Sequence, residues 1–245
     1  MPRSILPARS ELQGYHRATR SVTYGFLAAL PLLVMYEVAI LMVGGGVRVG
    51  ADVWTKTLLA VLGTTGWAAI GVAVLVAGLV VLWYERHRRP PLRARYFGWL
   101  LGESLIYAIF LAFLVSGIVG VLFMVMPPLA QFQALPLPTK LALSLGAGLY
   151  EELVFRVILV GGLFLVLRRV LKDRKQAYIV AAVVGALIFS WVHYIGPYGD
   201  PFAMASFTFR FLFGLALNGV FLLRGFAAAA WTHALYDVLV VTRLL

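Results

Sequence analysis

About seven long apolar stretches, separated by short polar or basic breaks, constrain this sequence more than any other feature. A membrane-spanning helix needs about 20 mostly apolar residues. Hydrophobic residues make up 62% of the 245-residue chain and charged residues only 13%, which is too much apolar surface for one water-soluble core. We therefore predict an all-α fold, a polytopic transmembrane helical bundle of about seven spans (seven to eight). The stretches cover residues 22–44, 57–84, 97–126, 139–168, 176–195, 203–223 and 226–243.

The positions of the basic residues predict the orientation of the chain. In short loops, Lys and Arg are enriched on the cytoplasmic side of a membrane. With these spans, 15 of the 21 basic residues fall on one side, which predicts a multi-pass membrane protein with a cytoplasmic N-terminus. The formal net charge is +11, and the basic residues that produce it stand between the apolar runs. We therefore expect the protein to interact with the lipid bilayer and not with nucleic acid. The first apolar run is too long for a signal peptide, and we expect it to be retained.

Two adjacent carboxylates lie inside the fourth apolar stretch, in the segment from Tyr150 to Arg156. A charge near the bilayer centre costs at least about 2.5 kcal/mol on insertion scales, so each one needs a partner or a task. Glu152 and Arg156 are four residues apart and share a helix face, which predicts an ion pair. Glu151 points about 100° away in a turn of 3.6 residues. This pair therefore leaves Glu151 free to act as a general base.

Histidines on two further stretches add to this picture. His193 ends the segment that begins at Phe189, at the outer end of the fifth stretch. His233 and Asp237 are four residues apart in the seventh stretch, so both face the same way. At about 1.5 Å of rise per residue, these groups and Glu151 can converge in the middle-to-outer half of the membrane. Three other charges within spans are interpreted as packing or ion-pair residues: Glu37, Glu103 and Arg210.

The three motifs, in this order on successive spans, resemble the CAAX protease and bacteriocin-processing (CPBP) family. This family is also called the Abi family and includes the type II CAAX prenyl endopeptidases. The resemblance covers about residues 97–243 and implies a membrane-embedded endopeptidase that cleaves near a substrate's C-terminus or releases a leader. The matching positions are Glu151, Glu152 and Arg156, then Phe189 and His193, then His233 and Asp237.

The resemblance also implies roles for these residues. Glu151 and His193 would activate water, and His233 and Asp237 would orient or stabilise the developing oxyanion. This chain has Asp237 where many members have Asn. An ionised carboxylate cannot donate a hydrogen bond, so we expect Asp237 to orient His233. The predicted organisation is a cytoplasmic N-terminal segment (1–21), two transmembrane helices (22–96) and a CPBP-like catalytic transmembrane core (97–245).

The N-terminal part carries a second resemblance. The run from Pro31 to Glu37 and the run from Gly50 to Asp52 look similar to bacterial members proposed to process C-terminal sorting signals, the myxosortase-like group. Glu37 lies in the outer half of the first span and could reach the catalytic region. The substrate implied is a membrane-anchored protein or peptide with a CAAX-like or sorting-signal tail. The sequence predicts no oligomeric state.

Other chemistries use the same residues. The chain has no cysteine, which excludes disulfides, thiolate metal ligands and a Cys nucleophile. Zinc could be held by an oxygen and nitrogen ligand set. The sequence lacks a His-Glu-x-x-His segment, however, and the spacing is loose, so we favour glutamic chemistry with no cofactor. A serine mechanism through Ser144 or Ser190 lacks a nucleophile motif. In the zinc alternative described above, the metal ligands would be Glu151, His193, His233 and Asp237.

Two alternatives come from other functional classes. An ion-coupled transporter also places acids and histidines within spans, but the sequence has no inverted repeat and its charges cluster in the C-terminal half. A non-catalytic membrane scaffold or immunity protein is the second alternative, because some relatives are linked to bacteriocin resistance. Replacing Glu151 by Gln would separate these classes, since a scaffold should keep its function.

Overall fold

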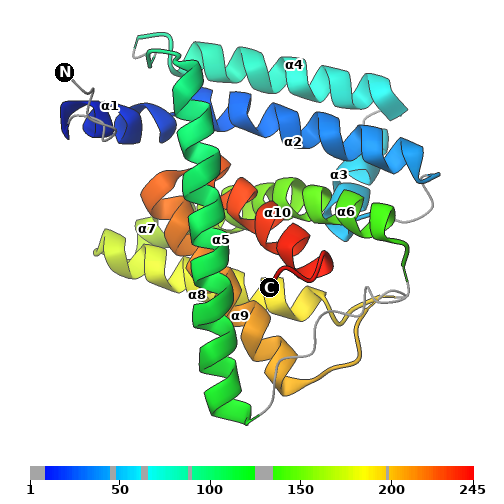
Figure 1. The fold of residues 1–245 in the computed structure, drawn as a ribbon. Helices are drawn as coiled ribbons and strands as arrows, with labels where there is room; N and C mark the ends of the chain where they lie inside the picture. The colour runs from blue at the N-terminus through cyan, green and yellow to red at the C-terminus, as the bar shows by residue number, and fades with distance from the viewer. Residues whose placement is uncertain (1–8, 45–47, 62–65, 88–89, 125–134, 197–198) are drawn as a thin grey trace, which may run out of the picture.

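The computed structural model describes residues 9–44, 48–61, 66–87, 90–124, 135–196 and 199–245. All regular structure in these ranges is helical, which confirms the all-α prediction (Figure 1). The helices of the N-terminal half are α1 (Arg9–Thr19), α2 (Val22–Met42), α3 (Gly50–Val61), α4 (Gly66–Tyr84) and α5 (Ala94–Phe123). The C-terminal half contains α6 (Leu137–Gly146), the π-helical segments η2 (Ala147–Glu151) and η3 (Leu153–Val160), and then α7 (Gly161–Val170), α8 (Arg174–Val192), α9 (Met204–Arg224) and α10 (Phe226–Val241).

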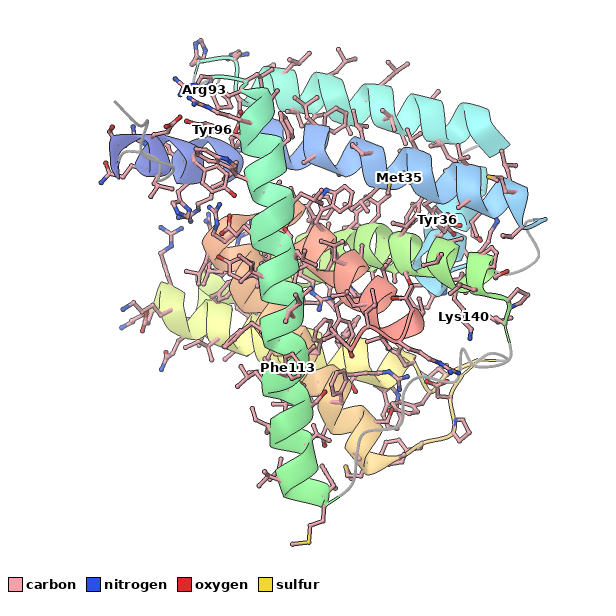
Figure 2. All side chains as sticks on the ribbon, viewed as in Figure 1. Met35, Tyr36, Arg93, Tyr96, Phe113 and Lys140 are labelled. Atoms are coloured by element: carbon pink, nitrogen blue, oxygen red, sulfur yellow. The ribbon has the colours of Figure 1, made fainter. Side chains whose placement is uncertain are left out.

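Long apolar helices with exposed apolar faces make this a polytopic membrane protein. Among the described helices, four are long and apolar enough to cross a membrane: α2, α5, α8 and α9. The described apolar part of α4 (Ile70–Tyr84) and α10 are shorter. Phe113 on α5, labelled in Figure 2, and Leu75 on α4 are each 68% exposed. Outward apolar surface of this kind is typical of a protein that contacts lipid.

The second predicted span, residues 57–84, is wrong in its first part, because it combines residues of two helices. The stretch 57–84 joins the end of α3 to α4, and residues 62–65 lie outside the described residues. Hydropathy stays high across residues 57–61, so an apolar count cannot separate two helices there. The other predicted spans agree with helices to within a few residues, although the end of 97–126 also falls outside the described part. Helix α1, within the polar N-terminal segment, was not predicted.

Local sequence explains several helix ends. At the start of α2, the Ser21 hydroxyl accepts a hydrogen bond from the Tyr24 N–H at 3.2 Å. At the start of α8, the Asp173 carboxylate accepts from the Lys175 N–H at 2.8 Å. These are N-caps, which satisfy donors that the first helical turn leaves free. Gly225 has φ of 88° between α9 and α10, a conformation that glycine adopts without strain. It lets α10 turn back into the bundle.

The sequence predicted one uninterrupted helix for the fourth apolar stretch, but the structure interrupts it. It starts as α6, passes through η2 and η3, and continues as α7. A π-helical turn bonds residue i to residue i+5 and is found frequently at functional sites. Glu151 is the last residue of η2, and Glu152 lies between the two π-helical segments. Both predicted carboxylates therefore sit on the irregular part of this helix.

Helix α10 packs against α2, α5, α6, α9 and η2, so it brings the seventh span against the carboxylate-bearing segment. In Figure 1 the long α5 runs across the other helices. The approach of η2 to α10 depends on Gly148. A Cβ atom at this position would lie 2.5 Å from the Ala234 Cβ and 2.6 Å from the Ala230 carbonyl oxygen. Only glycine allows the two backbones to come this close.

We expect Gly148→Ala to lower the free energy of unfolding by about 1–3 kcal/mol, as overpacking of a core does. The atoms in the way belong partly to the α10 backbone, which cannot move aside cheaply. Gly162→Ala is the matched control, because its added Cβ meets nothing within 4 Å. Equilibrium unfolding in mixed micelles measures both variants. Equal stability of the two would contradict the close approach of η2 and α10.

Candidate active site

Glu152 is the centre of a fully buried charged group. Its Oε1 lies 3.0 Å from Nη1 of Arg156 and 2.7 Å from Nδ1 of His233. Glu152 is 0% exposed, Arg156 1% and His233 4%. The predicted ion pair between Glu152 and Arg156 is therefore present, and the carboxylate also accepts a hydrogen bond from the histidine of α10. A single acid thus links the fourth and seventh predicted spans.

Arg156 has an aromatic neighbour as well as an acidic one. Its Cζ lies 4.4 Å from the centroid of the Phe189 ring, within the range of a cation–π interaction. Within the described part of the chain, none of its three guanidinium nitrogens has a hydrogen-bond partner. The charge is therefore compensated by the Glu152 carboxylate and the Phe189 ring rather than by a set of hydrogen bonds.

Glu151 faces a different helix from Glu152. Its Oε2 lies 4.0 Å from Nε2 of His193, the residue that caps the C-terminal end of α8. The other ring nitrogen, Nδ1, lies 2.7 Å from the carbonyl oxygen of Phe189. Because a carbonyl oxygen only accepts, Nδ1 carries a proton. In the neutral ring, Nε2 therefore presents its lone pair toward Glu151.

The pair of Glu151 and His193 differs from the Glu152 group in its exposure. The Glu151 side chain is 15% exposed and the His193 side chain 25%. The gap of 4.0 Å between their polar atoms is longer than a direct hydrogen bond. Two proton acceptors thus face each other across a partly accessible gap, which is the arrangement that a bridging water fits.

His233 lies between two carboxylates. Its Nδ1 contacts Glu152, and its Nε2 lies 3.7 Å from Oδ2 of Asp237. The i, i+4 spacing on α10 therefore brings His233 and Asp237 together, as the sequence indicated. An ionised Glu152 carboxylate only accepts, so Nδ1 carries the proton in that hydrogen bond. This fixes the tilt of the imidazole and leaves its Nε2 edge toward Asp237.

The Phe189 ring packs against both histidines. The Phe189 ring centroid lies 4.9 Å from that of His193 and 6.1 Å from that of His233. Phe213 on α9 packs edge-on against His233 at 5.6 Å, and Phe155 packs against Phe189 at 5.1 Å. Phe189 was among the positions that match the family motif. Phe213 and Phe155 were missed, since phenylalanines at helical spacing are ordinary in any apolar helix.

The segment after α8 is fixed by an ion pair that the sequence indicated only in part. Arg210 on α9 pairs with Asp200 and donates to the Tyr194 hydroxyl at 2.9 Å. The Asp200 N–H donates to the His193 carbonyl oxygen at 2.8 Å. Arg210 thus has the packing role expected of it. Asp200 was missed because nothing in a loop sequence marks it as the partner of a residue ten positions later.

Serine and metal chemistry find little support in the described residues. The Ser144 hydroxyl donates to the Lys140 carbonyl at 2.9 Å, and the Ser190 hydroxyl donates to the Phe207 carbonyl at 2.7 Å. Both serines are engaged with the backbone. In the ranges that the structure describes, no three His, Asp or Glu side chains are arranged to hold a metal ion. As they are arranged, the four residues considered for zinc do not form such a group.

The remaining intramembrane acids are paired. Glu103 accepts hydrogen bonds from Arg224 at 2.5 and 2.7 Å and from Tyr107 at 2.6 Å, which agrees with its predicted packing role. Glu37 forms an ion pair with Lys56 at 2.8 Å. It also accepts from the hydroxyl of Tyr150, the neighbour of Glu151 in the chain. The first span does reach the edge of the candidate site.

Residues 133–239 match the family model described as type II CAAX prenyl endopeptidase, Rce1-like. The matched range contains all six predicted site residues. No curated protein and no solved structure matches the chain. The family match supports protease activity of the CAAX type, with a membrane-associated peptide as substrate. The family that the three motifs indicated is thus confirmed: over residues 133–239, the chain is similar to the Rce1-like type II CAAX prenyl endopeptidases.

Proposed function

We propose that this protein is a glutamic-type intramembrane endopeptidase. It would hydrolyse a peptide bond near the C-terminus of a membrane-anchored substrate, with a CAAX-like or sorting-signal tail. The observation that carries the proposal is the 4.0 Å approach of the Glu151 carboxylate to Nε2 of His193 at a partly exposed position. In the neutral ring, this nitrogen is an acceptor, because Nδ1 donates to the Phe189 carbonyl oxygen. Two acceptors at this separation can share the two protons of one water.

The chemistry follows from that arrangement. Glu151 and His193 hold the water, and one of them takes a proton as the water oxygen attacks the carbonyl carbon. A C–O bond forms and the carbonyl becomes an oxyanion. When the C–N bond breaks, the same proton passes to the leaving amine. One water is consumed, and the products are a carboxylic acid and an amine.

The buried charged group around Glu152 supports this step without taking the proton from water. Glu152 and Asp237 hold the two nitrogens of His233, and Arg156 offsets the charge of Glu152. The Nδ1 proton of His233 is donated to Glu152, so His233 would stabilise the oxyanion by donating from a protonated Nε2, which an ionised carboxylate cannot do. Asp237 then orients His233. Arg156 and Glu152 act through His233 and do not contact the substrate.

The membrane setting is part of the proposal. We place the N-terminus in the cytoplasm of a bacterial cell, because most basic residues fall between spans on one side. His193 and Asp200 then lie toward the outer face. A site that opens there suits the tails of exported proteins.

The full chain, purified in lipid nanodiscs, is expected to cleave a lipid-anchored peptide with one of the two tail types, and mass spectrometry of the products would locate the cut. Addition of a chelator should leave the rate unchanged, because the proposed step uses no metal. His193→Gln, purified identically, controls for contaminating proteases. Loss of cleavage on chelation that zinc restores would overturn the metal-free mechanism. Equal cleavage by His193→Gln would overturn the site.

A further inference from the structure

Four charged side chains outside the family match converge on the residue next to Glu151. They come from α2, from α3 and from the segment before α3, and they surround the hydroxyl group of Tyr150 and the ring of Tyr36. The four residues are Glu37, Arg48, Asp52 and Lys56.

Tyr150 is tied directly to this cluster. Its hydroxyl donates to Oε1 of Glu37 at 3.0 Å, and the same oxygen accepts from Nζ of Lys56 at 2.8 Å. Tyr150 is 6% exposed and Glu37 3%. A hydrogen bond from a hydroxyl to a buried, ion-paired carboxylate is among the stronger kinds in proteins. The Tyr150 side chain is therefore anchored to α2 by its hydroxyl group.

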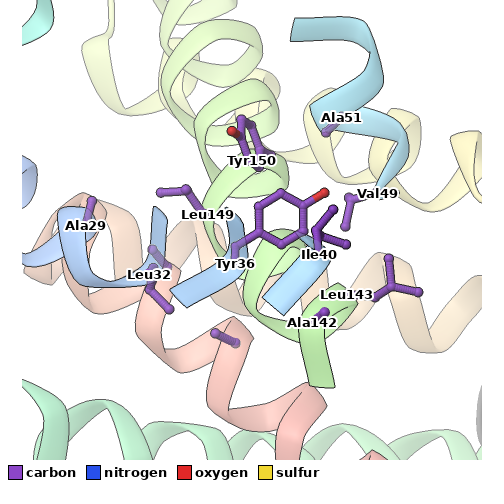
Figure 3. Packing of buried hydrophobic residues seen from close by; sticks show 12 residues of the cluster. Ala29, Leu32, Tyr36, Ile40, Val49, Ala51, Ala142, Leu143, Leu149 and Tyr150 are labelled. Atoms are coloured by element: carbon purple, nitrogen blue, oxygen red, sulfur yellow. The ribbon is translucent and has the colours of Figure 1, made fainter. Parts of the chain in front are cut away.

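The cluster is balanced in charge. Two acids face two bases: Asp52, 0% exposed, lies 2.9 Å from Lys56 and 3.1 Å from Arg48. The Tyr36 hydroxyl donates to Asp52 at 2.8 Å. The Tyr36 and Tyr150 ring centroids lie 5.4 Å apart in an edge-to-face arrangement, and Figure 3 shows the two side chains beside each other. Each acid in the cluster therefore has a basic partner.

The backbone just before Tyr150 is also closely packed. A Cβ on Gly146 would lie 2.4 Å from the Tyr36 ring, and one on Gly148 would collide with α10. The π-helical segment η2 is thus held by α10 on one side and by the tyrosines on the other. Consecutive Cα atoms are about 3.8 Å apart, so a shift of Tyr150 moves Glu151 with it.

We propose that Tyr150, Glu37 and Lys56 are positioning residues that hold Glu151 toward His193, so that helices outside the family match are part of the catalytic apparatus. The inference rests on the proposed function. A displacement of about 1 Å in a reacting group can lower a rate by about 100-fold. The hydrogen bond from Tyr150 to Glu37 therefore acts on the rate without touching the substrate.

Tyr150→Phe removes only the hydroxyl and keeps the ring against Tyr36. We expect kcat per folded molecule to fall by about 10- to 100-fold with KM unchanged, since substrate contacts are kept. Tyr107→Phe is the matched control, because it also removes a tyrosine hydroxyl that donates to an arginine-paired glutamate, Glu103. A purely structural role of Tyr150 would lower the yield or stability and leave kcat per folded molecule equal to that of the control, which would overturn the proposal.

Combining Tyr150→Phe with Glu37→Leu tests whether the two act as one unit. If Tyr150 works through Glu37, the double variant should be no slower than the slower single variant. Rate losses that multiply instead would show independent effects and contradict the coupling.

A readout that needs no activity separates failure of this inference from failure of the proposed function. The chain has no cysteine, so Glu151→Cys with His193→Cys introduces one reactive pair for a short thiol cross-linker. Added Tyr150→Phe should slow cross-linking by about tenfold, and added Tyr107→Phe should not. Unchanged cross-linking overturns the positioning role even if no substrate is cleaved. Slowed cross-linking in a protein without peptidase activity would overturn only the proposed function.

Discussion

Replacement of Glu151 by glutamine is expected to lower kcat for peptide hydrolysis by about 10³-fold, within the range of general-base removal. The amide has nearly the same shape as the carboxylate and still reaches toward His193, but it cannot take a proton from water. KM should stay close to the wild-type value, because the change affects the transition state more than the bound substrate. Progress curves with the lipid-anchored peptide measure both constants.

The matched control for this variant is Glu11→Gln. Glu11 is a partly exposed acid on α1 that pairs with Arg95, and its neutralisation should leave kcat unchanged. Cleavage by Glu151→Gln at the rate of the control would remove Glu151 from the mechanism.

Short-range features of the site could be predicted from the sequence. The ion pair of Glu152 with Arg156 and the approach of His233 to Asp237 follow from i, i+4 spacing on a helix, and both are present. Apolar length was enough to locate most helices and to identify a polytopic membrane protein. The separation of the two acids also held, with Glu151 toward α8 and Glu152 toward α10. These features depend on residues within one turn, which a linear pattern records.

Features that depend on contacts between distant segments could not be predicted. The hydrogen bond of Tyr150 to Glu37 joins residues 113 positions apart, and no local spacing reports such a pair. The π-helical turns around Glu151 were missed for a related reason, because they arise from the packing of η2 against α10 and α2 rather than from a local propensity. Hydropathy likewise could not separate α3 from α4. Side-chain partners across helices required the folded structure.

The second large effect is expected on stability. Arg156→Met should lower the free energy of unfolding by about 3–5 kcal/mol, the range for breaking a buried ion pair by removing one partner. Arg156 is 1% exposed and Glu152 0%, so water cannot replace the lost guanidinium. Methionine keeps much of the volume over the Phe189 ring, so the loss reports mainly the uncompensated Glu152 carboxylate. Unfolding in mixed micelles, followed by the helical circular-dichroism signal, measures it.

The double variant Glu152→Met with Arg156→Met tests that cause. It removes both charges, and replacement of a whole buried pair by apolar residues is often close to neutral. Here recovery should be incomplete, because His233 loses the acceptor that lies 2.7 Å from its Nδ1. A double variant as unstable as Arg156→Met alone would mean that lost packing, and not an unpaired charge, sets the effect. Partial recovery of the free energy of unfolding would mean that the main role of Arg156 is to compensate the charge of Glu152, which must be ionised to hold His233.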